Sequence, residues 1–207
     1  MFRIIILTIM LVINYQQSFA QNQPASNLLA QNKVDLDLIE NYLNSIKFLE
    51  ANFIQTASNG DTIKGKLFLS RPGKMRVEYG QPAPSLIIVN ANVLAYTDLE
   101  LEETSYLTTN STPSSFLTRA NFSFVAKDVE IVGFNKSDNL VKVSIMKKNK
   151  KEAGEFSLIF TANALKFVEM EVKNDMNEIT RVSFITSQFD SPIDNKLFVI
   201  KSKNLPR

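Results

Sequence analysis

The chain has 207 residues, with 23 basic and 21 acidic side chains and a formal net charge of +2, and it contains neither cysteine nor histidine. This composition excludes disulfides, thiolate metal sites, thiol nucleophiles and lipid-modified cysteines, and it removes the commonest general base and metal ligand. The near balance of charge provides no electrostatic footprint for nucleic-acid binding.

The first 20 residues have the pattern of a secretory signal peptide. Arg3 precedes an apolar stretch over 4–13, and Ser18-Phe19-Ala20 supplies a small-x-small cleavage site. We expect cleavage after Ala20, because the alternative, a retained membrane anchor, requires roughly 20 apolar residues. An exported protein without a cysteine or an anchor fits a bacterial periplasm, so we expect a periplasmic protein that is not itself membrane-anchored.

The segment after the signal peptide is expected to lead into one helix. Residues 21–34 are polar and amide-rich, and they predict a flexible N-terminal segment ahead of a single domain over 35–207. Asp37 and Glu40 mark a helix start, and apolar residues at helical spacing predict an amphipathic helix over 36–48. Beyond this helix the hydrophobic period changes to alternation.

Most of the remaining chain predicts β-strands. Alternating runs are separated by short turn signals, and strands spaced this closely indicate an antiparallel meander rather than βαβ units. The expected fold class is therefore mainly β with some α structure (α+β), with about eleven strands. The candidate strands are 49–57, 61–70, 74–80, 85–90, 92–97, 101–107, 126–134, 139–147, 154–161, 164–173, 178–189 and 196–201.

Residues 108–124 interrupt the meander and predict a short helical segment. One of the polar residues before Pro113 can cap a helix whose core runs from Ser114 to Ala120. Because it falls in the middle of the meander, this segment must lie across one face of the sheet.

One face of the predicted sheet is consistently apolar. In the strand over 74–80, Met75, Val77 and Tyr79 alternate with charged side chains. Fifteen phenylalanines and no tryptophan are available to line this face, and only two helical segments are available to cover it. Either the helices and the sheet pack into an ordinary core, or an incomplete and removable cover leaves a cavity for an apolar ligand.

Five motifs follow one another in the order expected of one known family. They are "FLEANFIQ" over 48–55, "GKLFLSRPGKMRVEY" over 65–79, a strand pair over 85–104, "STPSSFLTRAN" over 111–121 and "NDMNEITRVSF" over 174–184. In this order the motifs resemble those of the LolA family of periplasmic carriers of outer-membrane lipoproteins. The Arg-Pro-Gly element between two strands is the most specific of them.

The resemblance implies an unclosed, strongly curved antiparallel β-barrel with a helical lid over an acyl-chain cavity. Such carriers receive acylated lipoproteins from an inner-membrane ABC-type release complex and pass them to a LolB-like acceptor at the outer membrane. That acceptor has the same fold but is anchored through an N-terminal cysteine. A cysteine-free chain is therefore expected to be the soluble carrier, monomeric and without a metal, a cofactor or catalytic residues.

Arg71 follows the strand over 61–70 and lies on the same side as Leu67 and Leu69. At the edge of a cavity its guanidinium can donate several hydrogen bonds to carbonyls or hydroxyls of the lid. With the resemblance, we interpret Arg71 as a lid latch that favours the closed, empty state. The alternative is that Arg71 reaches solvent at the strand end, or pairs with Glu78 or another acid.

The residues expected to line the acyl-chain cavity come from the central strands and from the lid. Plain core packing is an equal alternative for each of them. Met75, nearest the turn, is the preferred rim residue, because a flexible thioether suits variable apolar guests. The candidates are Leu67, Leu69, Met75, Val77, Tyr79, Leu94 and Tyr96 in the sheet, and Phe116, Leu117 and Phe122 in the lid.

Two charged segments are expected at the surface. The lysine cluster over 146–152 predicts a solvated hairpin tip, or alternatively a docking patch for an acidic partner or anionic lipid head groups. The segment over 99–104 predicts an exposed acidic edge.

Three other functions compete with the carrier. An enzyme is disfavoured because no recognisable carboxylate pair and no nucleophile with its base is present. A periplasmic sensor or adaptor with this fold would resemble RseB, whose additional C-terminal domain has no counterpart after the last predicted strand. A generic lipid-binding protein is the hardest to separate, because an apolar cavity does not identify its guest.

Overall fold

The computed structural model describes residues 25–148 and 153–200, and most of this part of the chain is β-structure. The strands are β1 (Phe48–Thr56), β2 (Thr62–Ser70), β3 (Lys74–Tyr79), β4 (Ser85–Asn90), β5 (Val93–Asp98), β6 (Glu103–Thr108), β7 (Val129–Lys136), β8 (Leu140–Lys147), β9 (Glu155–Thr161), β10 (Phe167–Lys173) and β11 (Ile179–Phe189).

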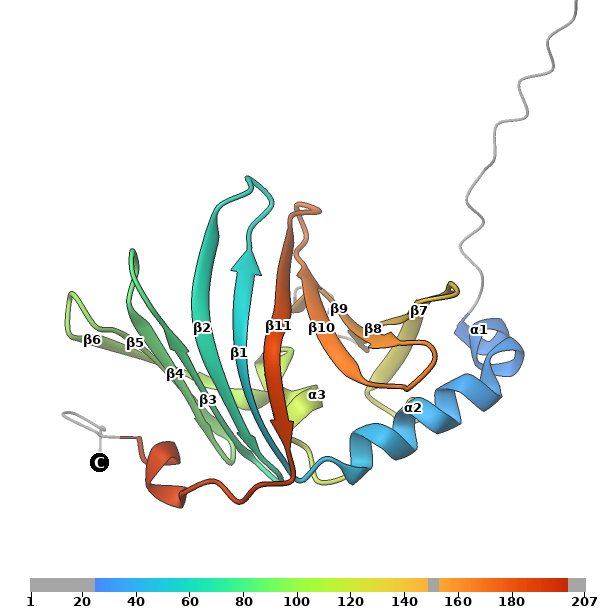
Figure 1. Cartoon of the computed structure of the whole chain (residues 1–207), viewed down its shortest axis with the longest axis horizontal. Coiled ribbons are helices and arrows are strands. Elements are labelled where there is room, and N and C mark those ends of the chain that lie inside the picture. The colour runs from blue at the N-terminus through green and yellow to red at the C-terminus, as the bar shows by residue number, and fades with distance from the viewer. Residues whose placement is uncertain (1–24, 149–152, 201–207) are drawn as a thin grey trace, which may run out of the picture.

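Within the described residues these eleven strands form one sheet in the order β6-β5-β4-β3-β2-β1-β11-β10-β9-β8-β7. Neighbouring strands are antiparallel, as shown for example by the pairs that β1 makes with β2 and β11. The sheet is strongly curved, and its edge strands β6 and β7 are not paired with each other (Figure 1). The predicted fold class, an unclosed antiparallel half-barrel of about eleven strands, is confirmed.

The last predicted strand, over 196–201, is wrong. The described part of that segment contains the 3₁₀ helix η3 (Asn195–Phe198) instead. The Asp194 side chain caps this turn by accepting a hydrogen bond from the Lys196 amide at 2.9 Å. A local side-chain cap of this kind competes with strand pairing.

The helices before the sheet also differ from the prediction. Where the sequence predicts a flexible segment over 21–34, residues 25–31 form α1 (Ala25–Gln31), which contacts β7. The next helix, α2 (Lys33–Ser45), begins earlier than the predicted 36–48 and ends earlier, because β1 begins at Phe48. Residues 1–20, with the predicted signal peptide, lie outside the described residues.

The core of the protein lies on one face of the sheet, here called the inner face. Alternation along the strands directs apolar side chains there, and α2 adds Leu36, Ile39 and Leu43 to the same buried cluster. The opposite, outer face carries most of the charged side chains of the strands. The largest side chains buried in the inner-face cluster include Phe53, Phe122, Phe160 and Phe167.

Gly65 in β2 lies beneath the ring of Phe53, which explains why this strand has a glycine in its interior. A Cβ atom added at Gly65 would lie 2.3 Å from Phe53 Cζ and 2.6 Å from the backbone oxygen of Glu78. Because one of these neighbours is backbone, the site cannot relax cheaply.

We therefore expect Gly65→Ala to lower the free energy of unfolding by about 1–3 kcal/mol, as overpacking does. Urea unfolding monitored by circular dichroism measures this change. Gly80→Ala is the matched control, because its nearest neighbour, the Lys64 oxygen, lies at an ordinary 3.6 Å. Equal stability of the two variants would contradict this packing.

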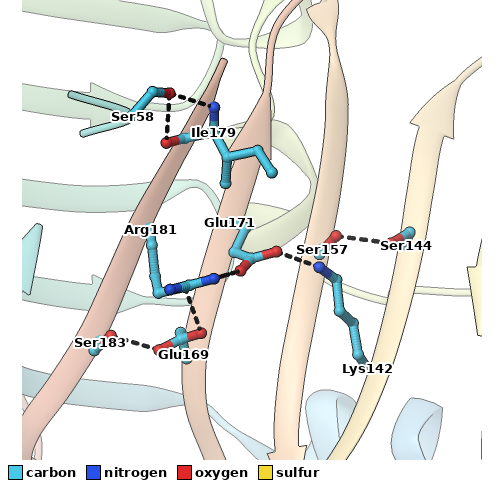
Figure 2. A network of polar contacts seen from close by, with 9 residues as sticks. All are labelled: Ser58, Lys142, Ser144, Ser157, Glu169, Glu171, Ile179, Arg181 and Ser183. Atoms are coloured by element: carbon cyan, nitrogen blue, oxygen red, sulfur yellow. Dashed lines mark hydrogen bonds and ion pairs between the residues drawn. The ribbon is translucent and has the colours of Figure 1, made fainter. Parts of the chain in front are cut away.

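A polar network braces the outer face across β8, β10 and β11 (Figure 2). Glu171 is 5% exposed, and its carboxylate accepts hydrogen bonds from Lys142 and from Arg181, whose Nη2 lies 2.7 Å from Glu171 Oε1. Arg181 also pairs with Glu169 at 3.1 Å. Burial alone would raise the pKa of Glu171, but the hydrogen bonds from Lys142 and Arg181 outweigh it, so the pKa lies below its ordinary value.

Replacing Glu171 by glutamine is expected to lower the free energy of unfolding at neutral pH by about 1–3 kcal/mol, since charge-assisted bonds to a buried carboxylate are lost. The folded-state pKa lies below the ordinary 4.5, so this contribution is present above about pH 4.5 and is lost as the pH falls through the folded-state value. The difference from wild type should therefore shrink on acidification. Glu50→Gln, which removes an exposed partner of Lys66, is the control and should change stability by less than about 1 kcal/mol.

Candidate functional site

The segment between β6 and β7 crosses the inner face and is here called the lid (residues 108–124). It contains the 3₁₀ turn η1 (Thr109–Ser111) and the helix α3 (Ser114–Thr118), which is slightly shorter than the predicted core of Ser114 to Ala120. In Figure 1, α3 lies behind β1 and β11, within the curve of the sheet. The lid therefore connects the two unpaired edges of the half-barrel.

The apolar side chains of the lid are buried against the inner face. Phe116 and Leu117 are each 4% exposed, and Phe122 is 1% exposed. The Phe122 ring makes edge contacts with Phe116 and Phe124, at centroid distances of 6.4 and 4.8 Å. Phe116 also stacks on Phe156 of β9 at 6.1 Å. In this structure the lid is closed, and its side chains fill the hollow of the sheet.

Arg71 lies immediately after β2, with its guanidinium against the lid. Its Nε donates to the backbone oxygen of Leu117 at 2.6 Å, and its Nη1 donates to the backbone oxygen of Leu43 in α2. Burial lowers the pKa of Arg71 to about 10. Glu78, the acid considered as an alternative partner, pairs with Arg76 instead. One side chain thus links β2, α2 and α3.

Backbone groups attach the start of the lid and the end of α3 to turns on the same side of the sheet. The Gly73 amide donates to the Thr118 oxygen at 2.6 Å, and the Thr109 amide donates to the Asn92 oxygen at 2.9 Å. The Thr109 hydroxyl adds a bond to the Ala91 oxygen at 3.0 Å. The wall formed by β2 to β5 therefore holds the lid at its start and at the end of α3.

Helix α2 holds the last part of the lid through two side chains that are absent from the predicted site, Asn44 and Glu40. Asn44 donates to the Phe122 oxygen at 2.9 Å and accepts from the Phe122 amide at 2.7 Å. Glu40 accepts from the Phe124 amide at 2.9 Å. The signal in the sequence was their i,i+4 spacing, which places both polar side chains on one face of the helix.

The prediction of a solvated hairpin tip for the lysine cluster over 146–152 is wrong at Lys147. Its side chain is not at a solvated hairpin tip, because Lys147 is 4% exposed and lies beneath the lid. It donates to the backbone oxygen of Asn110 at 2.7 Å, to the Asn110 side-chain oxygen, and to the Ser115 hydroxyl at 3.2 Å. Alternation with Val143 and Ile145 would have placed Lys147 on the inner face. Residues 149–152 of the cluster lie outside the described residues.

An ion pair ties the end of α3 to the start of β7. Arg119 Nη2 lies 3.0 Å from Asp128 Oδ2, and the hydrogen bond from Arg119 lowers the pKa of Asp128 below its ordinary value. The Arg119 guanidinium also lies over the Phe116 ring, 5.0 Å from its centroid.

The predicted cavity residues are brought together, but they pack against one another rather than lining an open space. Of the seven predicted sheet residues, five are 7% exposed or less: Leu67, Leu69, Met75, Val77 and Leu94. Met75 is therefore a core residue in the closed state rather than a rim residue. Tyr79 is partly buried; its hydroxyl donates to Gln55 at 2.9 Å, and burial raises its pKa to about 12. The alternative of core packing thus describes this closed arrangement.

Tyr96 departs from the predicted set, because it is 40% exposed. The lid contacts the sheet near the turn between β4 and β5, at Ala91 and Asn92, and Tyr96 lies farther along β5. The side chain therefore extends beyond the cover that the lid provides.

Two open hollows lie outside the core. One, of about 770 Å³, opens beside the lid between Gly73, Asn92 and Arg119. The other, of about 730 Å³, lies on the outer face between η3 and β3 to β6, near Arg76 and Ile88. Neither is lined by the predicted cavity residues.

The described residues contain no group of three or more His, Cys, Asp or Glu side chains placed to hold a metal ion. A search of the same residues finds no helix long and apolar enough to cross a membrane. The site is therefore an apolar surface, the inner face of the sheet, covered by a lid that hydrogen bonds hold in place.

Comparison with known proteins matches the chain to a family model and finds solved structures with a similar fold. The family model described as "Outer membrane lipoprotein carrier protein LolA" matches residues 44–201. An outer-membrane lipoprotein carrier protein of Legionella pneumophila is 24% identical over 173 residues, covering 80% of this chain and 84% of that protein. An uncharacterized protein of Rickettsia prowazekii is 27% identical over 151 residues, covering 73% of this chain and 70% of that protein.

Solved structures support the fold alone. An uncharacterized conserved protein from Thermus thermophilus superposes with a TM-score of 0.50 at 8% sequence identity, covering 84% of this chain and 96% of that one.

Proposed function

The chain belongs to the LolA family of outer membrane lipoprotein carrier proteins, and from this premise we propose that it carries acylated lipoproteins across the periplasm. The acyl chains enter between the lid and the inner face of the sheet. An inner-membrane ABC-type complex supplies the cargo, and an outer-membrane acceptor, LolB-like where one is present, receives it. In this proposal the carrier is a monomer exported by its first 20 residues, and it needs neither a cofactor nor catalysis.

The physical problem of such a carrier is release rather than capture. Removing acyl chains from water contributes roughly 0.8 kcal/mol per buried CH₂ group, so even a modest apolar surface captures them. A carrier that must also let go needs an empty state of comparable stability. In the closed structure the lid supplies this state, because Phe116, Leu117 and Phe122 occupy the surface that the acyl chains need.

The observation that carries this proposal is the position of Arg71. Its guanidinium is partly buried and bonded to backbone oxygens of the lid and of α2, at Leu117 and Leu43. Charge-assisted bonds of this kind contribute about 1.5–3 kcal/mol each. Entry of acyl chains under the lid breaks the bond to Leu117, so Arg71 opposes loading and favours release.

Native mass spectrometry of the protein purified from periplasm tests this function. We expect a bound polypeptide whose mass includes its acyl chains. The control is a variant without residues 1–20, which stays in the cytoplasm and should carry no acylated polypeptide. Finding only free fatty acid or phospholipid on the exported protein would contradict the proposal and favour a generic lipid-binding protein.

A further inference from the structure

Two strands of the sheet end their inner-face apolar rows in a cation. In β2, Leu67 and Leu69 precede Arg71, and in β8, Val143 and Ile145 precede Lys147. Both cations are directed at the lid, from opposite walls of the half-barrel. The second cation has no role in the function proposed above.

Lys147 is held by acceptors that come from the lid. The backbone and side-chain oxygens of Asn110 and the hydroxyl of Ser115 accept its protons, and the Phe116 ring centroid lies 5.8 Å from its Nζ. Hydrogen bonds of this kind stabilise a buried ammonium. Lifting the lid would remove them, so these contacts oppose opening.

Lys147 and Arg71 contact different parts of the lid. Arg71 and Gly73 hold the end of α3, at Leu117 and Thr118, on the wall that contains β2. Lys147 holds the first half of the lid, from η1 to the start of α3, on the wall that contains β8. The lid is therefore fastened across the half-barrel rather than hinged on one wall.

We propose that Lys147 is a second fastening residue of the lid, after Arg71. It attaches Asn110 and Ser115 to β8 and so determines how readily the lid lifts from the wall that contains β8. The inference rests on the proposed function for the meaning of opening, because a looser lid would admit acyl chains more easily. The contacts themselves do not depend on the identity of the cargo.

Hydrogen exchange of the full-length protein without cargo tests this role. In Lys147→Met, a side chain of similar length has no donors, and we expect the amides of Thr112 and of residues 114–118 to exchange about 10-fold faster, equivalent to about 1.4 kcal/mol. Global stability should stay level or rise, because an apolar side chain replaces a buried charge. If Lys147 had only a structural role, its replacement would instead lower global stability, and exchange in the lid would rise no more than exchange in the rest of the fold.

Lys142→Met is the matched control. Lys142 lies on the same strand but points to the outer face, where it pairs with Glu171. Its replacement should lower global stability while exchange in the lid stays at the wild-type rate. Lid exchange that is unchanged in Lys147→Met, or raised equally in both variants, would overturn the proposal.

Asn110→Ala identifies the partner. It removes one of the three acceptors of Lys147, so lid exchange should rise in this variant, and adding Lys147→Met should raise it only to the level of Lys147→Met alone. Fully additive effects would contradict the pairing. Because no cargo is present in these measurements, they can fail while acylated polypeptide is still found on the exported protein, and the reverse also holds.

Discussion

Replacing Arg71 by leucine is expected to leave loading of the carrier intact and to impair delivery. The variant loses the bonds to Leu117 and Leu43 and gains an apolar side chain at the edge of the inner face. If about 3 kcal/mol of preference for the closed, empty state is lost, the apparent affinity for cargo rises roughly 100-fold. Cargo would then stay on the carrier.

The measurement is transfer of a fluorescent diacylated lipopeptide from loaded carrier to acceptor, together with its dissociation constant. Arg76→Leu is the matched control, because Arg76 lies on the neighbouring strand, faces outward and bonds to Glu78 and to the Leu197 oxygen. That variant should load and transfer like wild type. Normal transfer by Arg71→Leu would refute the latch.

Replacing Phe122 of the lid by alanine is expected to destabilise the empty protein. It is also expected to increase the stabilisation that bound cargo provides. Phe122 is 1% exposed and packs between Phe116 and Phe124, so its loss should lower the free energy of unfolding by about 3–5 kcal/mol. The space it leaves lies on the proposed acyl-chain surface, so bound cargo should restore part of that loss.

Unfolding in urea with and without a diacylated lipopeptide measures both effects. Phe198→Ala is the matched control, because Phe198 is fully buried but belongs to η3, which packs on β3 and β4 from the outer face. We expect it to lose similar stability and to gain no more from the lipopeptide than wild type does. If the lipopeptide stabilised both variants equally, the lid would not be part of the binding surface.

The sheet could be predicted from the sequence because its signal is local and repeated. Period-2 alternation with short turns determines strands and antiparallel neighbours, and it placed Arg71 on the same side as Leu67 and Leu69. The end of the sheet could not be predicted this way. The segment over 196–201 is apolar enough for a strand, but a cap by Asp194 forms η3 instead.

The lid contacts could be predicted only in part, because most of them depend on distances between remote segments. Asn44 and Phe122 are 78 residues apart in the chain, and Lys147 and Asn110 are 37 apart. For Lys147 two sequence signals disagree: the neighbouring lysines predict a solvated tip, whereas alternation in β8 directs the side chain inward. Polar composition likewise concealed α1, whose Leu28 and Leu29 pack against the core.

In the proposed function, whether the inner face holds a cavity depends on the state of the lid, which no sequence pattern encodes. The predicted residues Leu67, Leu69, Met75, Val77 and Leu94 are buried here under the lid side chains. The same residues would line an acyl-chain site once the lid is displaced. Under this proposal, core packing and ligand binding are alternative uses of one surface, selected by lid position.

A structure of the protein in complex with a diacylated lipopeptide tests this account most directly. The account predicts acyl chains between α3 and the inner face, in contact with Leu67 and Met75, with the Arg71 guanidinium no longer bonded to Leu117. Acyl chains bound in the outer-face hollow beside η3, with the bond between Arg71 and Leu117 intact, would contradict it.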